Sequence, residues 1–595
     1  MQKGHSLEAA KLYMQALKHD DQDDQDARIW ANLGNALSVA GSQDKALQAY
    51  QISVALCPEN PMMRFNLGVA LLDNDMLIQA QEHLEFAAGK TPEFAWAHER
   101  LGDLYYRRNM RSQSLRSYDR AIELRPLDFG LKWRRGLAEL SICYRNEKEI
   151  NTARENYLKQ LTNLLHSFDP SSQEAVATAF QGLTQTPFYL AYQGRNDINL
   201  QRLYGEYIAK IVRAAFSGLP EVNQAPPKDK DGRWRVGFVS KYFARHSVWK
   251  LPLRGWLENL DKKYFSLYGY ATTHCPDSPG ADLCRKYVHG DFQVNQLAET
   301  IARDSLHAIV YPEIGMDWKT TCLAALRLAP VQMAGAGHPQ TTGLSTIDFF
   351  LSSKLMEPPD AQKYYTEKLV LLPNLSSYNY PSPEVTELSR KSLGLPEKDI
   401  LYLSPQSLFK YIPRYDNIFA RIAQKVHGSK FLFIRHDYSE DITECFRKRI
   451  YECFENLNIN PDRHVIFLPR LTSDKFTALC GLCDIFLDNP GWSGNNTSLE
   501  AIWKGTPVIT MPLKMMRSRH AAANLQMTGV METICSSVEG YIQTAVDLGR
   551  NPERRRKVAQ ALHLQRSAAF GDKECVRGLN NLLKKEVAQH QQQIF

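Results

Sequence analysis

The sequence lacks the features that would place a protein in a membrane or outside the cell. Its 595 residues contain no long uncharged apolar run, and the first twenty, MQKGHSLEAAKLYMQALKHD, have no apolar signal-peptide core. The cysteines are scattered, and the one close pair, Cys480 and Cys483, has no second pair at zinc spacing. These absences predict a reduced, cytoplasmic protein without membrane insertion.

An excess of one charge is also missing. The 72 basic and 65 acidic residues give a formal net charge of +7, which is spread over a long chain and does not by itself indicate nucleic acid. Composition is otherwise ordinary for a globular protein, with 44% apolar residues. We therefore expect no nucleic-acid partner, and the length predicts three or more domains.

Several common motifs for nucleotides and metals are absent. No Walker sequence occurs, and in GAGHPQTTG the third glycine, Gly343, stands too far along for a dinucleotide fingerprint. The acidic residues of DKD at 229–231 lie in a linker, and no carboxylate couple typical of a glycosidase stands out. No metal ion is expected.

A repeat of 34 residues occupies the first part of the chain. Three copies align without a gap, with the same residue types at each position: Leu33, Leu67 and Leu101; Gly34, Gly68 and Gly102; Pro58, Pro92 and Pro126. This spacing is typical of tetratricopeptide repeats, whose paired helices stack into a solenoid and hold a polypeptide on the concave face. We assign residues 1–126 to the repeats and 127–228 to a helical connector and cap.

From Trp234 onward, short apolar runs alternate with amphipathic stretches. The predicted strands are RVGFVS, FSLYGYAT, HAIVYPE, VQMAGAG, DFFLSS, KLVLLP, ILYLSP, KFLFIRH, HVIFLP, DIFLDN and PVITMP. This alternation predicts two doubly wound α/β domains in tandem, over 229–385 and 386–595. Ligands of such sheets bind beyond the carboxyl ends of the strands.

One loop at such a strand end is rich in small polar residues. In NPGWSGNNTSLEAIWKGTPV, residues 489–508, Asn495, Asn496 and Thr497 stand where a helix begins. Glycines allow close backbone approach, and a helix start offers free N–H groups to an anion. The simpler alternative is a helix N-cap within a tight turn.

A second strand end supplies a cation. YLSPQSLFKYIP contains Gln406, Ser407 and Lys410, and Lys410 could flank a phosphate bound at the loop. Glu500, one helical turn beyond the loop, could accept hydrogen bonds from a ribose. A surface lysine and an exposed helical glutamate are the alternatives.

Two histidines follow strands of the first α/β domain. His246 comes just after the first strand, and His338 lies in the loop GAGHPQTTG. Either could act as a general base or an orienting group facing an interdomain cleft. Either could equally be held by backbone hydrogen bonds alone.

Four of these segments resemble the O-GlcNAc transferase family, glycosyltransferase family 41 with its SPINDLY-like branch. They are RVGFVSKYFARH, LRLAPVQMAGAGHPQTTG, LSPQSLFK and LDNPGWSGNNTSLEAIWKGTPVITMP, in the family's order and behind its repeats. The resemblance implies a GT-B fold, with two Rossmann-like lobes and a UDP-sugar in the C-terminal lobe. It also implies inverting, metal-independent transfer to side chains of polypeptides that the repeats present.

The resemblance also implies roles for single residues. His246 falls on the family's active-site histidine and Lys410 on its pyrophosphate-binding lysine. The loop residues Asn495, Asn496 and Thr497 fall on its His-Thr-Thr phosphate loop, and Glu500 falls on its ribose-binding aspartate. With Lys410 fixed, Ser407 and not Gln406 aligns with the family's glutamine.

Departures from the family leave three functions to compare. Asn495 replaces a histidine, and PEIGMD and GHPQTT resemble bacterial adhesin N-glycosyltransferases. The expected function is transfer of a sugar, as in O-GlcNAc transferases, to Ser or Thr. The alternatives are a GT-B transferase with another sugar or acceptor (asparagine or a small molecule), or a non-catalytic repeat scaffold.

The family further implies that amides inside the repeat superhelix hold the acceptor. Asparagines just before the Leu-Gly pair do so in the family, and the matching residues here are Asn32 and Asn66. The third matching position is Arg100, a cation that would favour acidic acceptor segments.

Overall fold

The computed structural model describes residues 2–19, 27–244, 246–335, 337–381 and 387–592. The chain forms two compact units. The first comprises residues 1–143 together with His436–Glu444, and the second comprises Tyr144–Arg435 and Cys445–Phe595.

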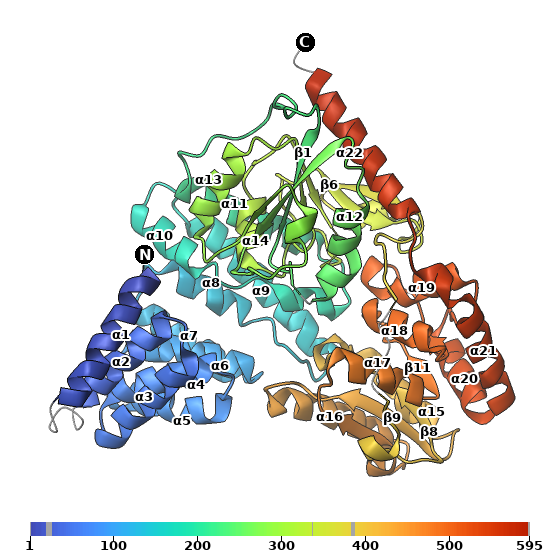
Figure 1. Ribbon diagram of the computed structural model, residues 1–595. Coiled ribbons are helices and arrows are strands. Elements are labelled where there is room, and N and C mark those ends of the chain that lie inside the picture. The colour runs from blue at the N-terminus through green and yellow to red at the C-terminus, as the bar shows by residue number, and fades with distance from the viewer. Residues whose placement is uncertain (1, 20–26, 245, 336, 382–386, 593–595) are drawn as a thin grey trace. The chain divides into compact units, whose positions relative to one another are not determined.

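The first unit begins with antiparallel helix pairs, drawn in blue in Figure 1. Its helices are α1 (Gln2–His19), α2 (Ala27–Val39), α3 (Gln43–Leu56), α4 (Pro61–Asp73), α5 (Leu77–Lys90), α6 (Ala95–Arg107), α7 (Arg111–Leu124) and α8 (Phe129–Leu137). The closest packing is within the pairs α2–α3, α4–α5 and α6–α7. The predicted repeat solenoid is confirmed.

The repeated glycines explain why these pairs pack so closely. A Cβ added at Gly34 would lie 2.6 Å from the Tyr50 ring, and one at Gly102 would lie 2.8 Å from the Tyr118 ring. Glycine is therefore required where the second helix of each repeat presses a bulky side chain onto the first.

A helical connector opens the second unit. It consists of α9 (Glu147–Ser167), α10 (Gln173–Gly182), the 3₁₀ segment η2 (Phe188–Gln193) and α11 (Ile198–Ala215). An added Cβ at Gly205 of α11 would overlap the backbone of Gly343, a residue with a positive φ of 74°. The connector therefore packs against the first α/β lobe with almost no space between the two backbones.

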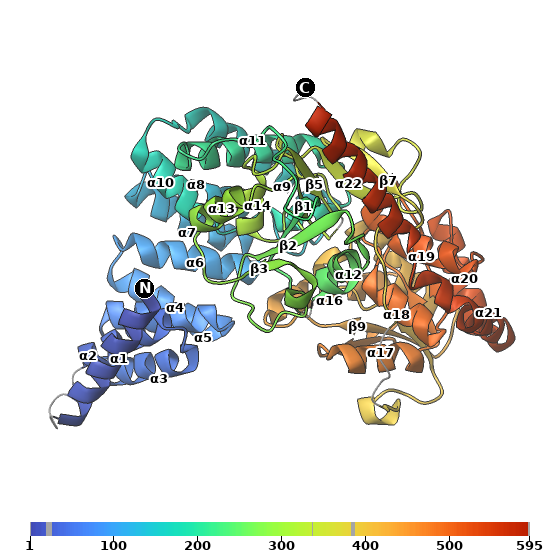
Figure 2. The same cartoon turned by 45° about the horizontal axis from the view of Figure 1, so that its top comes forward.

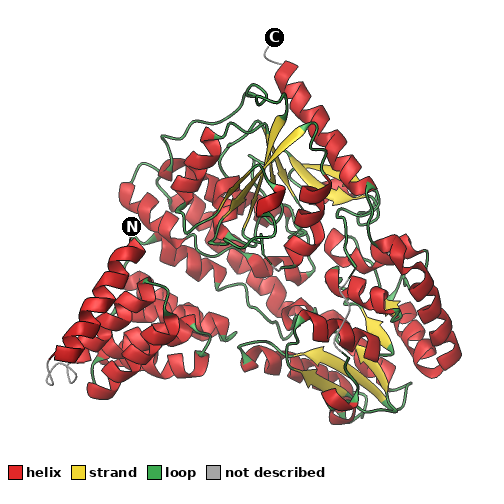
Figure 3. Ribbon diagram, viewed as in Figure 1, coloured by secondary structure: helices red, strands yellow, loops and turns green. Residues whose placement is uncertain are grey.

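The first lobe is built on a seven-stranded parallel sheet, ordered β3-β2-β1-β4-β5-β6-β7. Figure 3 draws the strands of both lobes in yellow. The strands are β1 (Trp234–Ser240), β2 (Phe265–Ala271), β3 (Lys286–Val288), β4 (Ala308–Tyr311), β5 (Val331–Ala334), β6 (Phe349–Ser353) and β7 (Lys368–Leu372). Its helices are α12 (Arg254–Asn259), α13 (Val294–Arg303) and α14 (Trp318–Ala324), and a π-helical turn, η3 (Trp249–Leu253), precedes α12.

The second lobe has a five-stranded parallel sheet, ordered β10-β9-β8-β11-β12. The strands are β8 (Ile400–Leu403), β9 (Ser429–Ile434), β10 (Val465–Leu468), β11 (Ile485–Leu487) and β12 (Val508–Ile509). The helices are α15 (Asn417–Ala423), α16 (Glu440–Glu455), α17 (Ser473–Leu482), α18 (Asn496–Lys504), α19 (His520–Thr528), α20 (Val538–Arg550), α21 (Pro552–Gln565) and α22 (Glu574–Gln592). The predicted pair of doubly wound lobes is confirmed.

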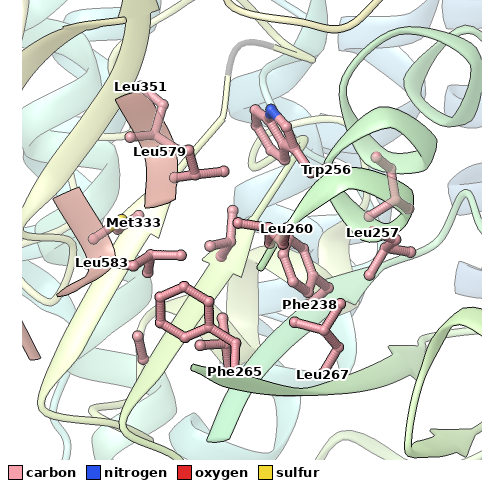
Figure 4. Packing of buried hydrophobic residues seen from close by; sticks show 14 of the residues in the cluster. Phe238, Trp256, Leu257, Leu260, Phe265, Leu267, Met333, Leu351, Leu579 and Leu583 are labelled. Atoms are coloured by element: carbon pink, nitrogen blue, oxygen red, sulfur yellow. The ribbon is translucent and has the colours of Figure 1, made fainter. Parts of the chain in front are cut away.

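The last helix returns to the first lobe. Helix α22 packs beside β7 and α12, as both views show (Figures 1 and 2). Its Leu579 and Leu583 are fully buried with Met333 and Leu351 of the first sheet (Figure 4). The two lobes are thereby joined through the core as well as through the chain between them.

Among the described helices, none is both long and apolar enough to cross a membrane. Cys480 and Cys483 are buried and carry free thiols.

Candidate active site

A cavity of about 380 Å³ lies between the two lobes of the second unit. The first lobe contributes Ser247, Val248 and His338, the second contributes Gln406, Lys410 and residues 492–497, and the connector contributes Tyr192. Lys410 follows β8, His338 follows β5 and the loop follows β11. The cavity is therefore at the carboxyl ends of the strands, where doubly wound sheets bind ligands.

A buried carboxylate, Asp488, fixes the loop after β11 by hydrogen bonds. Asp488 accepts hydrogen bonds from Ser493 Oγ at 2.8 Å, from the Gly494 backbone N–H at 2.8 Å and from Thr510 Oγ1 at 2.7 Å. Burial raises the pKa of Asp488 to about 7. Sequence reasoning missed this residue, although an acidic residue that ends an apolar strand was a visible signal.

The predicted loop residues gather at the start of α18. Asn495, Asn496 and Thr497 all line the cavity, and the Asn495 side chain makes no capping hydrogen bond. Its amide oxygen instead accepts from Asn524 Nδ2 at 3.2 Å. The side-chain N-cap that was the simpler alternative is thus not what the structure shows.

Lys410 and Gln406 join this loop from the neighbouring strand. Gln406 Nε2 donates to Thr497 Oγ1 at 2.8 Å, and Lys410 Nζ donates to Gln406 Oε1 at 3.2 Å. The backbone carbonyl of Lys410 accepts from Asn489 Nδ2 at 2.7 Å. Burial lowers the pKa of Lys410 to about 8, against the opposing effect of Asp488. This lysine is half-buried in a cavity and is not a surface lysine.

Ser407 and Glu500 lie outside the cavity lining. Ser407 is exposed at the start of a 3₁₀ turn, and Gln406 occupies the cavity instead. Glu500 is 4% exposed and sits behind Asn496, whose Nδ2 donates to Glu500 Oε1 at 3.0 Å. Lys250 of the first lobe reaches to 4.0 Å from the same oxygen, and burial raises the pKa of Glu500 to about 7.

His246 stands beside the cavity on the first-lobe side, next to the lining residues Ser247 and Val248. Its ring stacks on Tyr242 with centroids 3.8 Å apart, and its Nδ1 accepts from the Val248 backbone N–H at 3.2 Å. Burial lowers the pKa of His246 to about 4, aided by the cations Lys241 and Arg470. The neutral ring therefore carries its proton on Nε2.

His338 belongs to an aromatic wall that sequence reasoning did not foresee. Its ring stacks on Phe188 at 5.3 Å, and Tyr192 packs on Trp492 at 4.2 Å. Phe188 and Tyr192 come from η2, so the connector supplies part of the cavity. Burial lowers the pKa of His338 to about 4 and keeps the ring neutral.

The repeats contain a separate groove of about 410 Å³. Asn66 and Arg100 line it, together with Phe65, Phe94 and Trp96. Phe65 and Phe94 meet edge to face at 4.7 Å, and Trp96 is 51% exposed. Asn32 is exposed on α2 and does not line this groove, whereas Asn35 of the same helix does.

Over the described part of the chain, no three His, Cys, Asp or Glu side chains are grouped so that they could hold a metal ion.

The sequence pattern of glycosyl transferase family 41 matches residues 220–380 and 376–575 of this chain, more than half of its length. The chain belongs to glycosyl transferase family 41. A tetratricopeptide repeat pattern also matches residues 1–61 of this family-41 protein.

Two plant proteins illustrate how far the similarity extends. A probable UDP-N-acetylglucosamine–peptide N-acetylglucosaminyltransferase SEC of Arabidopsis thaliana is 25% identical over 388 residues, 62% of this chain and 39% of that protein. The probable SPINDLY enzyme of Solanum lycopersicum is 30% identical over 226 residues, 38% of this chain and 24% of that protein. This family-41 chain thus spans well under half the length of these curated relatives.

A solved structure extends the likeness to the whole fold. A mutant of the Thermobaculum terrenum O-GlcNAc transferase superposes with a TM-score of 0.69, covering 96% of this chain and 98% of that one at 19% identity. The fold of the family-41 chain is therefore helical repeats followed by two α/β lobes, as predicted.

Proposed function

We propose that the protein transfers a sugar from a UDP-sugar to serine or threonine side chains of polypeptides, with inversion and without a metal ion. The observation that carries this proposal is the cluster of Lys410, Gln406 and Thr497 around the loop that Asp488 holds. The family membership and the names of the plant relatives support the choice of donor and acceptor. The reaction is proposed for the cytoplasm.

In this proposal the cluster binds the diphosphate of the donor. Lys410 brings a positive charge, and the start of α18 brings backbone N–H groups and the side chains of Asn495, Asn496 and Thr497. Negative charge grows on the departing UDP as the sugar bond breaks, so donors that are already in place lower the barrier. These groups do the work that a divalent ion does elsewhere, which is why no metal is proposed.

Glu500 is proposed to help bind the ribose of the donor by holding the Asn496 side chain in place. Its side chain is enclosed behind the loop, so it would reach a ribose hydroxyl only if Asn496 turned aside; otherwise it fixes the Asn496 amide. Ser407 is exposed and does not line the cavity, so Gln406 is proposed to make the donor contact at this turn in its place.

His246 and His338 are proposed to face the acceptor and the sugar. His246 can donate from Nε2 to the acceptor oxygen and so orient it for attack, because its Nδ1 is occupied by the Val248 amide. With a pKa of about 4 it is uncharged at neutral pH and does not compete for the donor's phosphates. His338 closes the aromatic side of the same cavity.

The repeats are proposed to hold the acceptor chain. The Asn66 amide can donate to a peptide carbonyl and accept from a peptide N–H. It would therefore bind the backbone of an acceptor whatever its side chains are. Arg100 and the aromatic side chains of the groove add a preference for acidic and apolar segments. Asn32 is the equivalent amide of the preceding repeat.

Calorimetry with UDP and mass spectrometry of protein acceptors test this function together. We expect UDP to bind, and acceptor proteins incubated with UDP-N-acetylglucosamine or UDP-glucose to gain the mass of one sugar on Ser or Thr. Absence of UDP binding would leave the scaffold alternative, and a sugar found on asparagine would move the protein to the other transferase class.

A further inference from the structure

The connector and the second lobe share a buried ion pair that the proposed function does not use. Arg517 lies in the 3₁₀ turn η10 (Met516–Ser518), between β12 and α19. Its Nη2 lies 2.9 Å from Oδ2 of Asp197, the connector residue before α11, and the two side chains are only 3% and 1% exposed. Taking two charges out of water is costly, so a pair this deeply buried needs further partners that compensate for the loss.

The connector supplies those partners. Asp197 Oδ1 accepts a hydrogen bond from Arg154 Nη1 of α9 at 2.7 Å, and Arg154 Nη2 donates to the Asn196 backbone carbonyl at 2.9 Å. The Arg517 guanidinium also donates to the Arg195 backbone carbonyl. Asp197 therefore stands between two cations, and it would keep one of them if Arg517 were replaced.

The backbone of Arg517 holds the loop after β11. Its carbonyl accepts a hydrogen bond from the Ser493 N–H at 2.7 Å. Ser493 Oγ in turn donates to Asp488 at 2.8 Å and accepts from the Ala521 N–H at 2.8 Å. Ser493 and the next residue, Gly494, both line the cavity. Arg517 therefore connects Asp197 of the connector to the loop that is proposed to bind the diphosphate.

The same stretch of the connector also meets the loop through an aromatic contact. Tyr192 packs on Trp492, the residue before Ser493, with ring centroids 4.2 Å apart. The neighbouring Gln193 is held by Arg154, whose Nη1 donates to its Oε1 at 2.9 Å. Hydrogen-bonded charge pairs add a defined geometry to such a ring contact.

Resting on the proposed function, we propose that Arg517 is a positioning residue for the donor. Its ion pair with Asp197 fixes the loop after β11 in the conformation that binds the diphosphate, so the helical connector is part of the donor site. Arg517 touches no substrate in this role and acts through the Ser493 N–H. Groups that are held in place before a ligand arrives need not be ordered at a cost when it binds.

Calorimetry with UDP on the full chain and its variants tests this role, at a temperature well below the melting point of each protein. Arg517→Met removes the charge and is expected to weaken the Kd of UDP about tenfold, because the freed loop must be ordered on binding. The chain should stay folded, since Asp197 keeps Arg154 as its partner. Arg517→Lys, which keeps a charge opposite Asp197, should bind UDP markedly more tightly than the Met variant.

A second variant tests whether the two residues act as a pair. Asp197→Asn removes the opposite charge and should weaken UDP binding to a similar extent. Adding Arg517→Met to it should cost little more, because both changes remove the same contact.

A matched control comes from another ion pair of the second lobe. Arg390 Nη2 lies 2.8 Å from Oδ2 of Asp484, which precedes β11 and so stands at the end of the strand opposite the loop. Arg390→Met leaves Asp484 with Arg555 at 3.5 Å. This variant can lower the melting temperature but should leave the Kd of UDP unchanged.

An unchanged Kd of UDP in Arg517→Met would overturn the proposal and leave the pair with a purely structural role, whatever happens to the melting temperature. Equal weakening by Arg517→Lys or by Arg390→Met, or a fully additive loss in the double variant, would overturn it as well. Circular dichroism melting curves show which variants are folded, and if Arg517→Met is not, Asp197→Asn is judged against the parent by the same criterion. If the parent itself does not bind UDP, the proposed function fails instead, which separates the two outcomes.

Discussion

At the scale of single residues, Lys410 provides the sharpest test of the proposed diphosphate site. We expect Lys410→Ala to lower sugar transfer at least a hundredfold, because it removes the one full positive charge from the Gln406–Thr497 cluster. Turnover with a saturating acceptor is the measurement. Lys425→Ala, at an exposed lysine of the same lobe, is the matched control. Near-normal turnover of the Lys410 variant would contradict its assignment.

The protonation of Glu500 makes the stability of the folded protein depend on pH. Burial raises its pKa from 4.5 to about 7, so the folded state binds a proton that the unfolded state has already lost between these values. Its stabilising effect is therefore complete below about pH 4.5 and disappears as the pH rises through 7. Without ligand, the melting temperature of Glu500→Gln should be close to that of the parent at pH 5. At pH 8 it should be higher than that of the parent. A difference that does not vary with pH would mean that Glu500 keeps an ordinary pKa when folded.

The sequence could predict residues that follow strands but not those that approach the cavity from elsewhere. Lys410 and Thr497 were found because the segments that carry them follow recognisable strands and, for Thr497, open a helix. Tyr192 and His520 were missed because the first lies in a connector without strands and the second opens a helix whose sequence has no motif. Alignment placed Ser407 in the site, yet the chain turns so that Gln406 faces inward. Which of two adjacent side chains faces the cavity depends on the backbone conformation, which the sequence alone does not show.

At the scale of elements, the turn into α18 depends on a glycine. A Cβ at Gly494 would overlap Thr497 Oγ1 and Gln406 Nε2, the two atoms that form the bridge between the strand ends. Gly494→Ala should break that bridge and weaken UDP binding at least tenfold while the chain stays folded. Calorimetry provides the affinity. Gly218→Ala, where an added Cβ meets nothing within 4 Å, should bind UDP as the parent does.

Helix α22 is expected to be a structural clamp on the first lobe. Leu579 is fully buried against the sheet, so Leu579→Ala should destabilise the second unit by about 2–5 kcal/mol. Denaturant unfolding followed by tryptophan fluorescence measures the loss, and Lys585→Ala on the exposed side of the same helix is the control. A loss below about 1 kcal/mol would show that α22 docks only loosely.

Strands were predicted well where apolar runs were long and less well elsewhere. Every apolar run named in the sequence forms a strand, because a strand buried on both faces must be almost wholly apolar. β3, Lys286–Val288, was not expected, since it is short, lies at the edge of the sheet and is only half-buried. β3 forms because it pairs with β2, and this pairing cannot be predicted from the residues of β3 alone.

At the scale of the whole molecule, the repeats and the lobes have separable tasks in the proposed reaction. Among the described residues, those that line the proposed donor cavity all belong to the second unit, and those that line the groove with Asn66 and Arg100 all belong to the first. The repeat period could be predicted because the same residue types recur at a fixed spacing in the sequence. The groove's aromatic lining could not, because Phe65, Phe94 and Trp96 meet only when successive repeats stack.

Because the groove and the cavity are formed by different units, acceptor binding and donor hydrolysis should respond separately to substitution. We expect Asn66→Ala combined with Arg100→Ala to lower transfer to protein acceptors about tenfold or more, since the pair removes a backbone-reading amide and a cation from one groove. UDP-sugar hydrolysis without acceptor should stay unchanged, because the donor cavity is untouched. The preference of the parent for acidic acceptors should weaken as salt is raised, since the partly exposed side chain of Arg100 is screened. Gln51→Ala, at an exposed residue of α3, controls for general effects on the repeats. If the double variant melts earlier yet modifies proteins normally below its melting temperature, the two residues only stabilise the solenoid and the acceptor is held elsewhere.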